Sequence, residues 1–139
     1  MDAQHLYRIV LIDDSRMARL GLREQLNRTA EFRIVGEAAS MAEGLELIER
    51  LNPDLVLLDI SLPDGSGVQA CCRLVAGRPD TRVLILSVYD DPAVIREAIA
   101  AGAQGYVLKD TPVAMWRNAM RRAAGSGVVL GPQLIGLVL

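Results

Sequence analysis

The sequence predicts an α/β sandwich in which a five-stranded parallel sheet lies between two layers of helices. Three observations support this fold class. Short apolar runs recur along the 139 residues, segments with helical spacing separate them, and cap or turn residues mark most boundaries. Strands buried on both faces of a parallel sheet are typically continuous apolar runs of this kind. Hydrophobic residues make up 51% of the chain, which is enough for the core of one domain.

The apolar runs predict strands at residues 7–12, 33–35, 55–58, 83–86 and 106–108. We expect the first helix from about residue 15 to 28, with a stripe formed by Met17, Leu20, Leu22 and Leu26. The second helix begins at Ser40, three residues before Glu43 in the spacing of a capping box. Its inward face is predicted to hold Leu45, Ile48 and Leu51, and the pair Asn52-Pro53 ends it.

The remaining three helices have their own boundary signals. The stripe predicted for the third comprises Val68, Cys71, Cys72 and Val75. Asp91-Pro92 begins the fourth, Gly102 closes it, and Thr111-Pro112 begins the fifth. The inward residues of the fourth are Val94, Ile95, Ala98 and Ile99. With right-handed crossovers, this alternation of strands and helices predicts a flavodoxin-like, doubly wound (βα)5 sandwich in strand order 2-1-3-4-5.

Composition limits the function and location of the protein. The net charge of −2 is too balanced to indicate a nucleic-acid surface. Cys71 and Cys72 are neighbours in a helical stretch, where adjacent side chains diverge, so we expect free thiols. The first residues lack the basic start and apolar run of a signal peptide, and no apolar stretch approaches the roughly 18 residues that span a bilayer. These features predict a cytoplasmic protein without membrane contact.

Polar residues directly follow the predicted strands. Asp13-Asp14 follows the first strand, Asp59 the third, Ser87 the fourth and Lys109 the fifth. The carboxyl ends of parallel strands meet at one edge, where ligands bind in doubly wound sheets. Carboxylates brought together there repel one another, and a divalent cation would relieve the repulsion. Oxygen ligands without histidine or thiol favour magnesium over zinc.

Carboxylate, magnesium and lysine together indicate phosphoryl transfer. A cation and an ammonium can neutralise the oxygens of the transferring group, while a carboxylate serves as nucleophile. Asp59 is the predicted nucleophile because it is the single acidic residue directly after the central strand, between the other strand ends of the site. Each residue also has a structural interpretation on its own. Asp13-Asp14 before Ser15 could simply cap the first helix, and a lone lysine at a strand end is usually solvated.

The combined motifs resemble the receiver family of bacterial two-component response regulators. The residues that carry this resemblance are Asp13-Asp14, Leu57-Leu58-Asp59, Leu62-Pro63-Asp64-Gly65 with Gly67, Leu86-Ser87, and Gly102-Ala103 through Gly105-Tyr106 to Lys109. The Leu-Pro-Asp-Gly loop and the approach to Lys109 are similar to the NarL/FixJ, or LuxR-type, subfamily.

The resemblance implies a role for each site residue. Asp59 would be the phosphoacceptor. Asp14 and Asp59 would bind magnesium, or manganese in its place, together with the backbone carbonyl of Ser61, and Asp13 would act through bound water. Ser87 and Lys109 would contact the phosphoryl group. Tyr106 would be the switch aromatic that turns inward with Ser87.

The resemblance also implies the partners and the domain organisation. A sensor histidine kinase would donate the phosphoryl group, and activation would favour a homodimer. Residues 1–126 would form the receiver domain. Residues 127–139 would form a linker that is cut short before a helix-turn-helix DNA-binding output domain, so the whole protein would regulate transcription. The domain would not be a conventional enzyme, because it would catalyse only its own phosphorylation and dephosphorylation.

Two residues depart from the family pattern. Asp110 follows Lys109 where a proline with a cis peptide is usual, which leaves the geometry of that peptide open. Val88 stands where alanine is common, beside the predicted phosphoryl site.

Three other functions are compatible with single features of the sequence but not with the whole set. Residues 65–70 match a dinucleotide-binding fingerprint, but that motif belongs directly after the first strand rather than in the third crossover. Haloacid-dehalogenase-like phosphatases also use a strand-end aspartate, yet Ser61 stands where their second, acid/base aspartate is needed. A receiver-like module that is never phosphorylated would not need the complete set of Asp14, Asp59, Ser87 and Lys109.

Overall fold

The computed structural model describes residues 6–62, 65–78, 80–88, 90–125 and 129–130, with only the backbone for 61–62, 65–67, 70, 113 and 129–130. The strands are β1 (Tyr7–Ile12), β2 (Phe32–Ala38), β3 (Leu55–Asp59), β4 (Ser61–Leu62), β5 (Gly65–Ser66), β6 (Arg82–Ser87), β7 (Gly105–Leu108) and β8 (Val129–Leu130). The helices are α1 (Arg16–Leu26), α2 (Met41–Leu51), α3 (Gly67–Gly77), α4 (Pro92–Ala100) and α5 (Val113–Gly125).

The main sheet has the order β2-β1-β3-β6-β7-β8, and all its pairs are parallel. The strands predicted from the five apolar runs are β1, β2, β3, β6 and β7, so the predicted order 2-1-3-4-5 is confirmed. The short strand β8 adds a sixth member beside β7, with Gly105 opposite Val129 and Tyr106 opposite Leu130. These two residues fall in the segment that we expected to be a linker.

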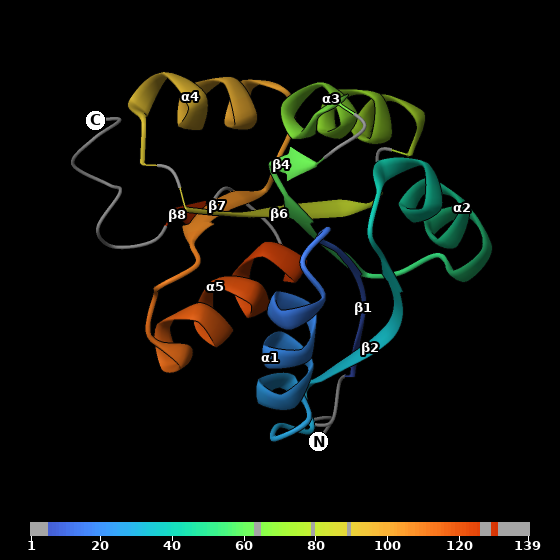
Figure 1. The fold of residues 1–139 in the computed structure, drawn as a ribbon, viewed down its shortest axis with the longest axis vertical. Coiled ribbons are helices and arrows are strands. Elements are labelled where there is room, and N and C mark those ends of the chain that lie inside the picture. Colours follow the sequence, from blue (N-terminus) through green and yellow to red (C-terminus); the bar gives the residue numbers. More distant parts are fainter. Residues whose placement is uncertain (1–5, 63–64, 79, 89, 126–128, 131–139) are drawn as a thin grey trace.

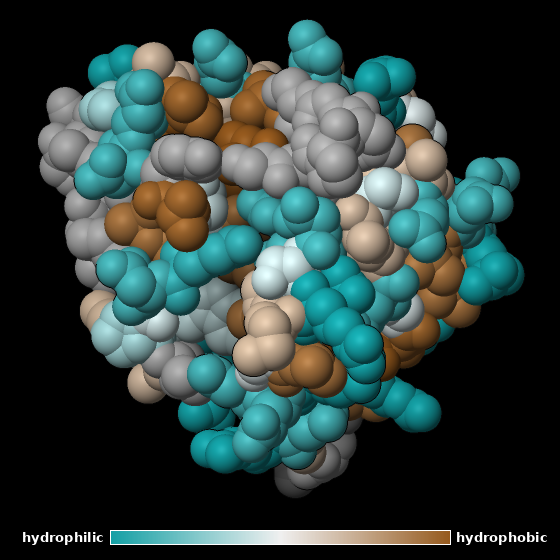
Figure 2. All heavy atoms as spheres, viewed as in Figure 1, coloured by the Kyte–Doolittle hydropathy of each residue, from teal (hydrophilic) through white to brown (hydrophobic). Residues whose placement is uncertain are grey.

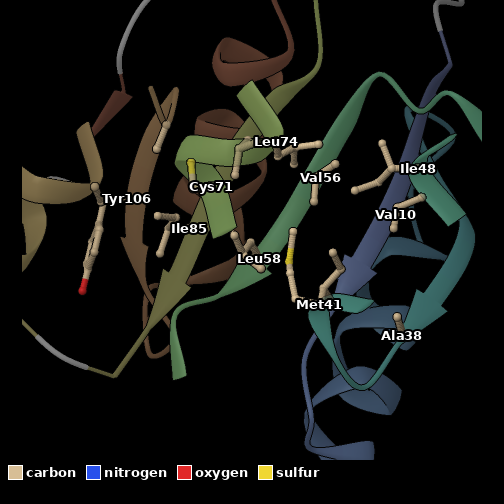
Figure 3. Packing of buried hydrophobic residues seen from close by; sticks show 14 of the residues in the cluster. Val10, Ala38, Met41, Ile48, Val56, Leu58, Cys71, Leu74, Ile85 and Tyr106 are labelled. Carbon is tan, nitrogen blue, oxygen red and sulfur yellow. The ribbon is translucent and has the colours of Figure 1, made fainter. Parts of the chain in front are cut away.

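Helices cover both faces of this sheet (Figure 1). On one face α2, α3 and α4 pack over Val10, Val56, Leu58 and Ile85, as Figure 3 shows for Cys71 and Leu74 of α3 and for Met41 and Ile48 of α2. On the other face α1 and α5 pack over the alternate strand residues, with Leu26, Trp116 and Met120 buried against Leu11 and Leu57. This alternation gives the central strands two buried faces and explains their unbroken apolar runs.

The predicted helix boundaries have identifiable causes in the structure. Ser15, Ser40 and Asp91 cap α1, α2 and α4, each accepting a backbone N–H of the first turn on its side-chain oxygen. Asn52 ends α2 with a φ of 49°, in the left-handed region. Gly102 follows α4 with a φ of 108°, and a β-carbon there would lie 2.9 Å from the Val75 side chain. Glycine is therefore required at this position by conformation and by space.

The predicted inward faces of α1, α2 and α3 are partly wrong, because some of the apolar residues assigned to them are exposed. Met17 and Leu20 are 78% and 44% exposed, and α1 instead directs Leu22 and Leu26 toward the core. The helical turn of 3.6 residues places Leu22 and Leu26 nearly in line but turns Met17 and Leu20 away from them. By the same geometry Cys72 is exposed while Cys71 and Leu74 are buried. Leu45 of α2 is 40% exposed.

A short antiparallel pair, β4 with β5, lies between β3 and α3 and was not expected from the sequence. The glycine-rich residues 65–70 form β5 and the start of α3, so they belong to the third crossover and not to the turn after β1 where the dinucleotide fingerprint is found. No helix within the described ranges is both long and apolar enough to cross a membrane.

Candidate functional site

The carboxyl ends of β1, β3, β6 and β7 bring the predicted site residues together. Asp13 follows β1, Asp59 ends β3, Ser87 ends β6 and Lys109 follows β7. One carboxylate oxygen each from Asp13, Asp14 and Asp59 lie within 4.8 Å of one another. Asp13, Asp59 and Ser87 are 1%, 6% and 1% exposed, whereas Asp14 is exposed. The cluster thus consists of two buried carboxylates, Asp13 and Asp59, and one exposed carboxylate, Asp14, at its solvent-facing side.

Asp13 is held from several sides. Its backbone N–H donates to the Ala38 carbonyl of β2 at 3.0 Å. One carboxylate oxygen accepts the Ser15 N–H at 2.9 Å, and the other accepts the Lys109 ammonium at 2.8 Å. Burying a carboxylate this deeply is costly unless hydrogen-bond donors contact it, and these donors meet that need. Asp13 therefore holds the N-cap residue Ser15 rather than capping α1 itself, and this contact is compatible with its part in the acidic cluster.

Lys109 is the cation of the site. Its Nζ lies 2.8 Å from Asp13 Oδ2 and 3.4 Å from Asp59 Oδ2, and its side chain is 27% exposed. Burial by itself would lower the pKa of this ammonium, but the hydrogen bond to Asp13 and the charges of Asp59 and Asp13 together raise it. The backbone N–H of Lys109 donates to the Ser87 carbonyl at 2.8 Å. The peptide to Asp110, which the sequence left open, is trans.

Ser87 connects the site to Tyr106 of β7. Tyr106 is completely buried and packs in the core beneath α4, as seen at the left of Figure 3. Burial raises the pKa of its hydroxyl, and a hydrogen bond with the Ser87 side chain partly opposes this rise. The aromatic ring thus lies inward and touches the serine at the edge of the acidic site.

The surroundings of the site leave an approach from solvent. Val88, Asp90, Leu108, Lys109 and Asp110 line a depression beside it. Val88 is 70% exposed, so its side chain borders this approach without closing it. Ser61 begins β4 just beyond Asp59, and the use of its carbonyl as a metal ligand stays a prediction.

Two residues next to the site, Arg19 and Glu37, were not predicted from the sequence. Arg19 of α1 donates a hydrogen bond to the Asp13 carbonyl oxygen and forms an ion pair with Glu37 of β2. A basic residue one turn into the first helix and an acidic residue near the end of a strand were the only signals. Neither is unusual enough to be singled out by pattern.

Chemically, the arrangement is an oxygen-rich anionic pocket with one fixed ammonium. Three carboxylates can hold a hard divalent cation. The ammonium and the Ser87 hydroxyl can contact further anionic oxygens. A carboxylate in such a place can attack phosphorus, because cations beside it stabilise the charge of the transferring group.

Comparisons with known proteins agree with this geometry. A family model described as the response regulator receiver domain matches residues 9–121. The DNA-binding transcriptional activator DevR/DosR of Mycobacterium tuberculosis is 41% identical over 105 residues, which are 76% of this chain and 48% of that protein. The nitrate/nitrite response regulator protein NarL of Escherichia coli is 34% identical over 134 residues, which are 96% of this chain and 62% of that protein.

A solved structure has the same fold over nearly the whole chain. The crystal structure of a LuxR-family two-component response regulator from an Aurantimonas species superposes with a TM-score of 0.91 at 28% identity. The superposition covers 96% of this chain and 95% of that chain. Among the two sequence relatives, by contrast, this chain spans only 48% and 62% of the full length.

Proposed function

This chain belongs to the response regulator receiver family, and on that premise we propose that it works as a phosphorylation switch with Asp59 as the phosphoacceptor. The observation that carries the proposal is the position of Lys109. Its ammonium lies within 3.4 Å of a carboxylate oxygen of Asp59 and within 2.8 Å of one of Asp13. A cation there supports charge on a phosphoryl group at Asp59 and holds the neighbouring acid in place.

The reaction is a transfer from nitrogen to oxygen. A carboxylate oxygen of Asp59 attacks phosphorus in the phosphohistidine of a sensor histidine kinase. The new O–P bond forms as the P–N bond breaks, and the imidazole nitrogen leaves with the electron pair. Lys109 and Ser87 contact the phosphoryl oxygens. Hydrolysis by water later returns the free carboxylate, so the domain catalyses only its own modification and its reversal rather than turnover of a separate substrate.

The donor set fits a magnesium ion, for which manganese would substitute. Asp14, Asp59 and the Ser61 carbonyl would hold the ion directly, and Asp13 through bound water. All these ligands are oxygens, as hard divalent cations prefer. When bound, the ion would neutralise charge on the phosphoryl oxygens. Asp14 suits this role because it is the exposed member of the cluster, at its mouth.

Ser87 and Tyr106 would pass the signal on. A phosphoryl group on Asp59 offers oxygens that draw the Ser87 hydroxyl, and Tyr106 follows the serine through their shared hydrogen bond. The ring belongs to β7, which pairs with β6 and also contacts α4, α5 and β8. The switch would therefore change the surface formed by α4, β7 and α5, and activation would favour a homodimer.

The output lies outside the receiver fold. Residues 1–126 would act as the receiver domain, and residues 127–139 would lead to a DNA-binding domain in a cytoplasmic transcription regulator. The support comes from relatives that extend beyond the matched residues, which make up 48% and 62% of their length, and one of them is named a DNA-binding transcriptional activator.

Mass spectrometry of the intact protein tests the proposal. The protein is incubated with acetyl phosphate or phosphoramidate, with magnesium or with EDTA. We expect one added phosphoryl group that requires magnesium and is absent from Asp59→Asn. Asp54, which directly precedes the same strand at its other end, offers the matched control, and Asp54→Asn should still be phosphorylated.

Two results would overturn the proposal. One is an unchanged mass with donors that modify another receiver in parallel. The other is sustained hydrolysis of a chromogenic phosphate ester that is lost in Asp59→Asn, since this would indicate a phosphatase.

A further inference from the structure

Arg19 lies between the acidic pocket and strand β2. Its Nη1 donates to the Asp13 carbonyl oxygen at 2.5 Å, and its Nε lies 3.3 Å from Glu37 Oε1. Both side chains are only 17% exposed. Figure 2 shows strongly hydrophilic residues gathered along α1 on its side toward β2. The guanidinium therefore connects α1, the loop after β1 and the end of β2.

The carbonyl that Arg19 contacts belongs to the peptide joining Asp13 to Asp14. Because a peptide unit is planar, fixing this oxygen fixes the plane and with it the direction in which the chain enters Asp14. The Asp13 carboxylate is held separately by Ser15 and Lys109. Within the described ranges no hydrogen bond holds the Asp14 carboxylate itself, so its position depends on the backbone.

Glu37 offsets part of the positive charge of this contact. A cation beside a cation site would repel the bound ion. The Glu37 carboxylate accepts from Arg23 through its other oxygen, so it is a shared anchor for two arginines of α1. Because Glu37 offsets part of the guanidinium charge, Arg19 can orient the peptide while repelling the ion less than an unpaired arginine would.

We propose that Arg19, braced by Glu37, is a positioning residue that orients the Asp13–Asp14 peptide and thereby places the Asp14 carboxylate for the divalent cation. The inference rests on the proposed function, because it takes Asp14 to be a metal ligand. Arg19 acts through Asp14 and touches neither the ion nor the phosphoryl group. Groups that orient metal ligands in this way commonly change metal affinity 10- to 100-fold when they are removed.

The test is a titration of the protein with magnesium chloride, without any phosphodonor. Trp116, the only tryptophan, lines a pocket together with Lys109, so its fluorescence can follow the site. We expect Arg19→Met to weaken magnesium binding about tenfold. Arg23→Met is the matched control, because Arg23 also contacts Glu37 from α1 but has no bond to Asp13. Its magnesium affinity should stay within about twofold of the wild-type value.

The direction of the change distinguishes positioning from charge. Both variants remove one positive charge near a cation site, so electrostatics alone would tighten binding. Amide hydrogen exchange at Asp14 should also become faster in Arg19→Met and not in Arg23→Met. If Arg19→Met fails to fold, Arg19→Lys replaces it. Lysine keeps the charge but lacks the planar fork that reaches carbonyl and carboxylate together, so weaker binding is again expected.

If the wild-type protein binds magnesium and the Arg19 variant binds it equally or more tightly, the role of Arg19 is contradicted while the proposed metal site stands. Absence of magnesium binding by the wild-type protein overturns the proposed metal site instead. The two failures are therefore distinguishable in one set of titrations.

Discussion

Replacing Lys109 by methionine removes the ammonium that two buried carboxylates share. With an effective dielectric constant of about 20, the attraction across the 2.8 Å contact to Asp13 is about 6 kcal/mol, and across the 3.4 Å contact to Asp59 about 5 kcal/mol. Desolvation of the three groups offsets much of this sum. Removing one partner of a buried pair typically leaves a loss of about 3 to 5 kcal/mol. Since the Lys109 side chain is 27% exposed, we expect the lower end, about 3 kcal/mol.

Urea unfolding followed by circular dichroism measures this loss. Arg121→Met is the control, because the Arg121–Glu31 pair is exposed and should be worth less than about 1 kcal/mol. The raised pKa of Lys109 also sets a pH dependence. Its stabilisation is complete below the ordinary lysine pKa and is lost as the pH rises through the raised value. Two results would contradict this role of Lys109. One is a Lys109→Met variant whose free energy of unfolding is no lower than that of Arg121→Met. The other is a stability difference between Lys109→Met and wild type that persists when the lysine is deprotonated.

Three further predictions concern the fold around the site. Gly102→Ala should lower the free energy of unfolding by about 1 to 3 kcal/mol, while Gly21→Ala, in open space within α1, should raise it by about 0.5 to 1 kcal/mol. Ser87→Ala and Tyr106→Phe should each lower the free energy of unfolding by about 1 kcal/mol. The double variant should lose less than the sum of the two, because the hydroxyls bond to each other. The hydrogen bond with Arg121 lowers the pKa of Glu31. The ion pair therefore stabilises the fold above the ordinary glutamate pKa, and this stabilisation is lost as the pH falls through the lowered pKa. Glu31→Gln should lack it at every pH.

Urea titrations check all three, the last at a series of pH values. Equal effects of the two glycine replacements would contradict the left-handed conformation assigned to Gly102. Fully additive losses in the serine and tyrosine variants would contradict their hydrogen bond. A Glu31→Gln difference that grows in acid would contradict the sign of that pKa shift.

Most residues of the site could be located from the sequence, because ligands bind at the carboxyl ends of the strands in a doubly wound sheet. Asp13 and Lys109 are 96 residues apart, yet each directly follows an apolar run, and parallel pairing brings such ends together. The order of the strands followed from alternation and handedness in the same way. The apolar runs were informative because burial on both faces removes polar residues from them.

Features that depend on a particular neighbour were not predictable. Strands β4, β5 and β8 have two residues each, too few for any periodic pattern. The exposure of Met17 and Leu20 depends on how α1 is rotated against the sheet, and a helix with apolar residues on several sides permits more than one rotation. The Arg19–Glu37 contact depends on the reach of long side chains between a helix and a strand.

The identity of the phosphorylated residue can be determined chemically. Borohydride reduces an aspartyl phosphate to homoserine, and peptide sequencing by mass spectrometry then reports its position. After incubation with acetyl phosphate and magnesium, we predict homoserine at position 59 and intact aspartate at positions 13 and 14. Homoserine at position 13 or 14, or none at position 59 in a protein that carries the added phosphoryl mass, would contradict Asp59 as the phosphoacceptor.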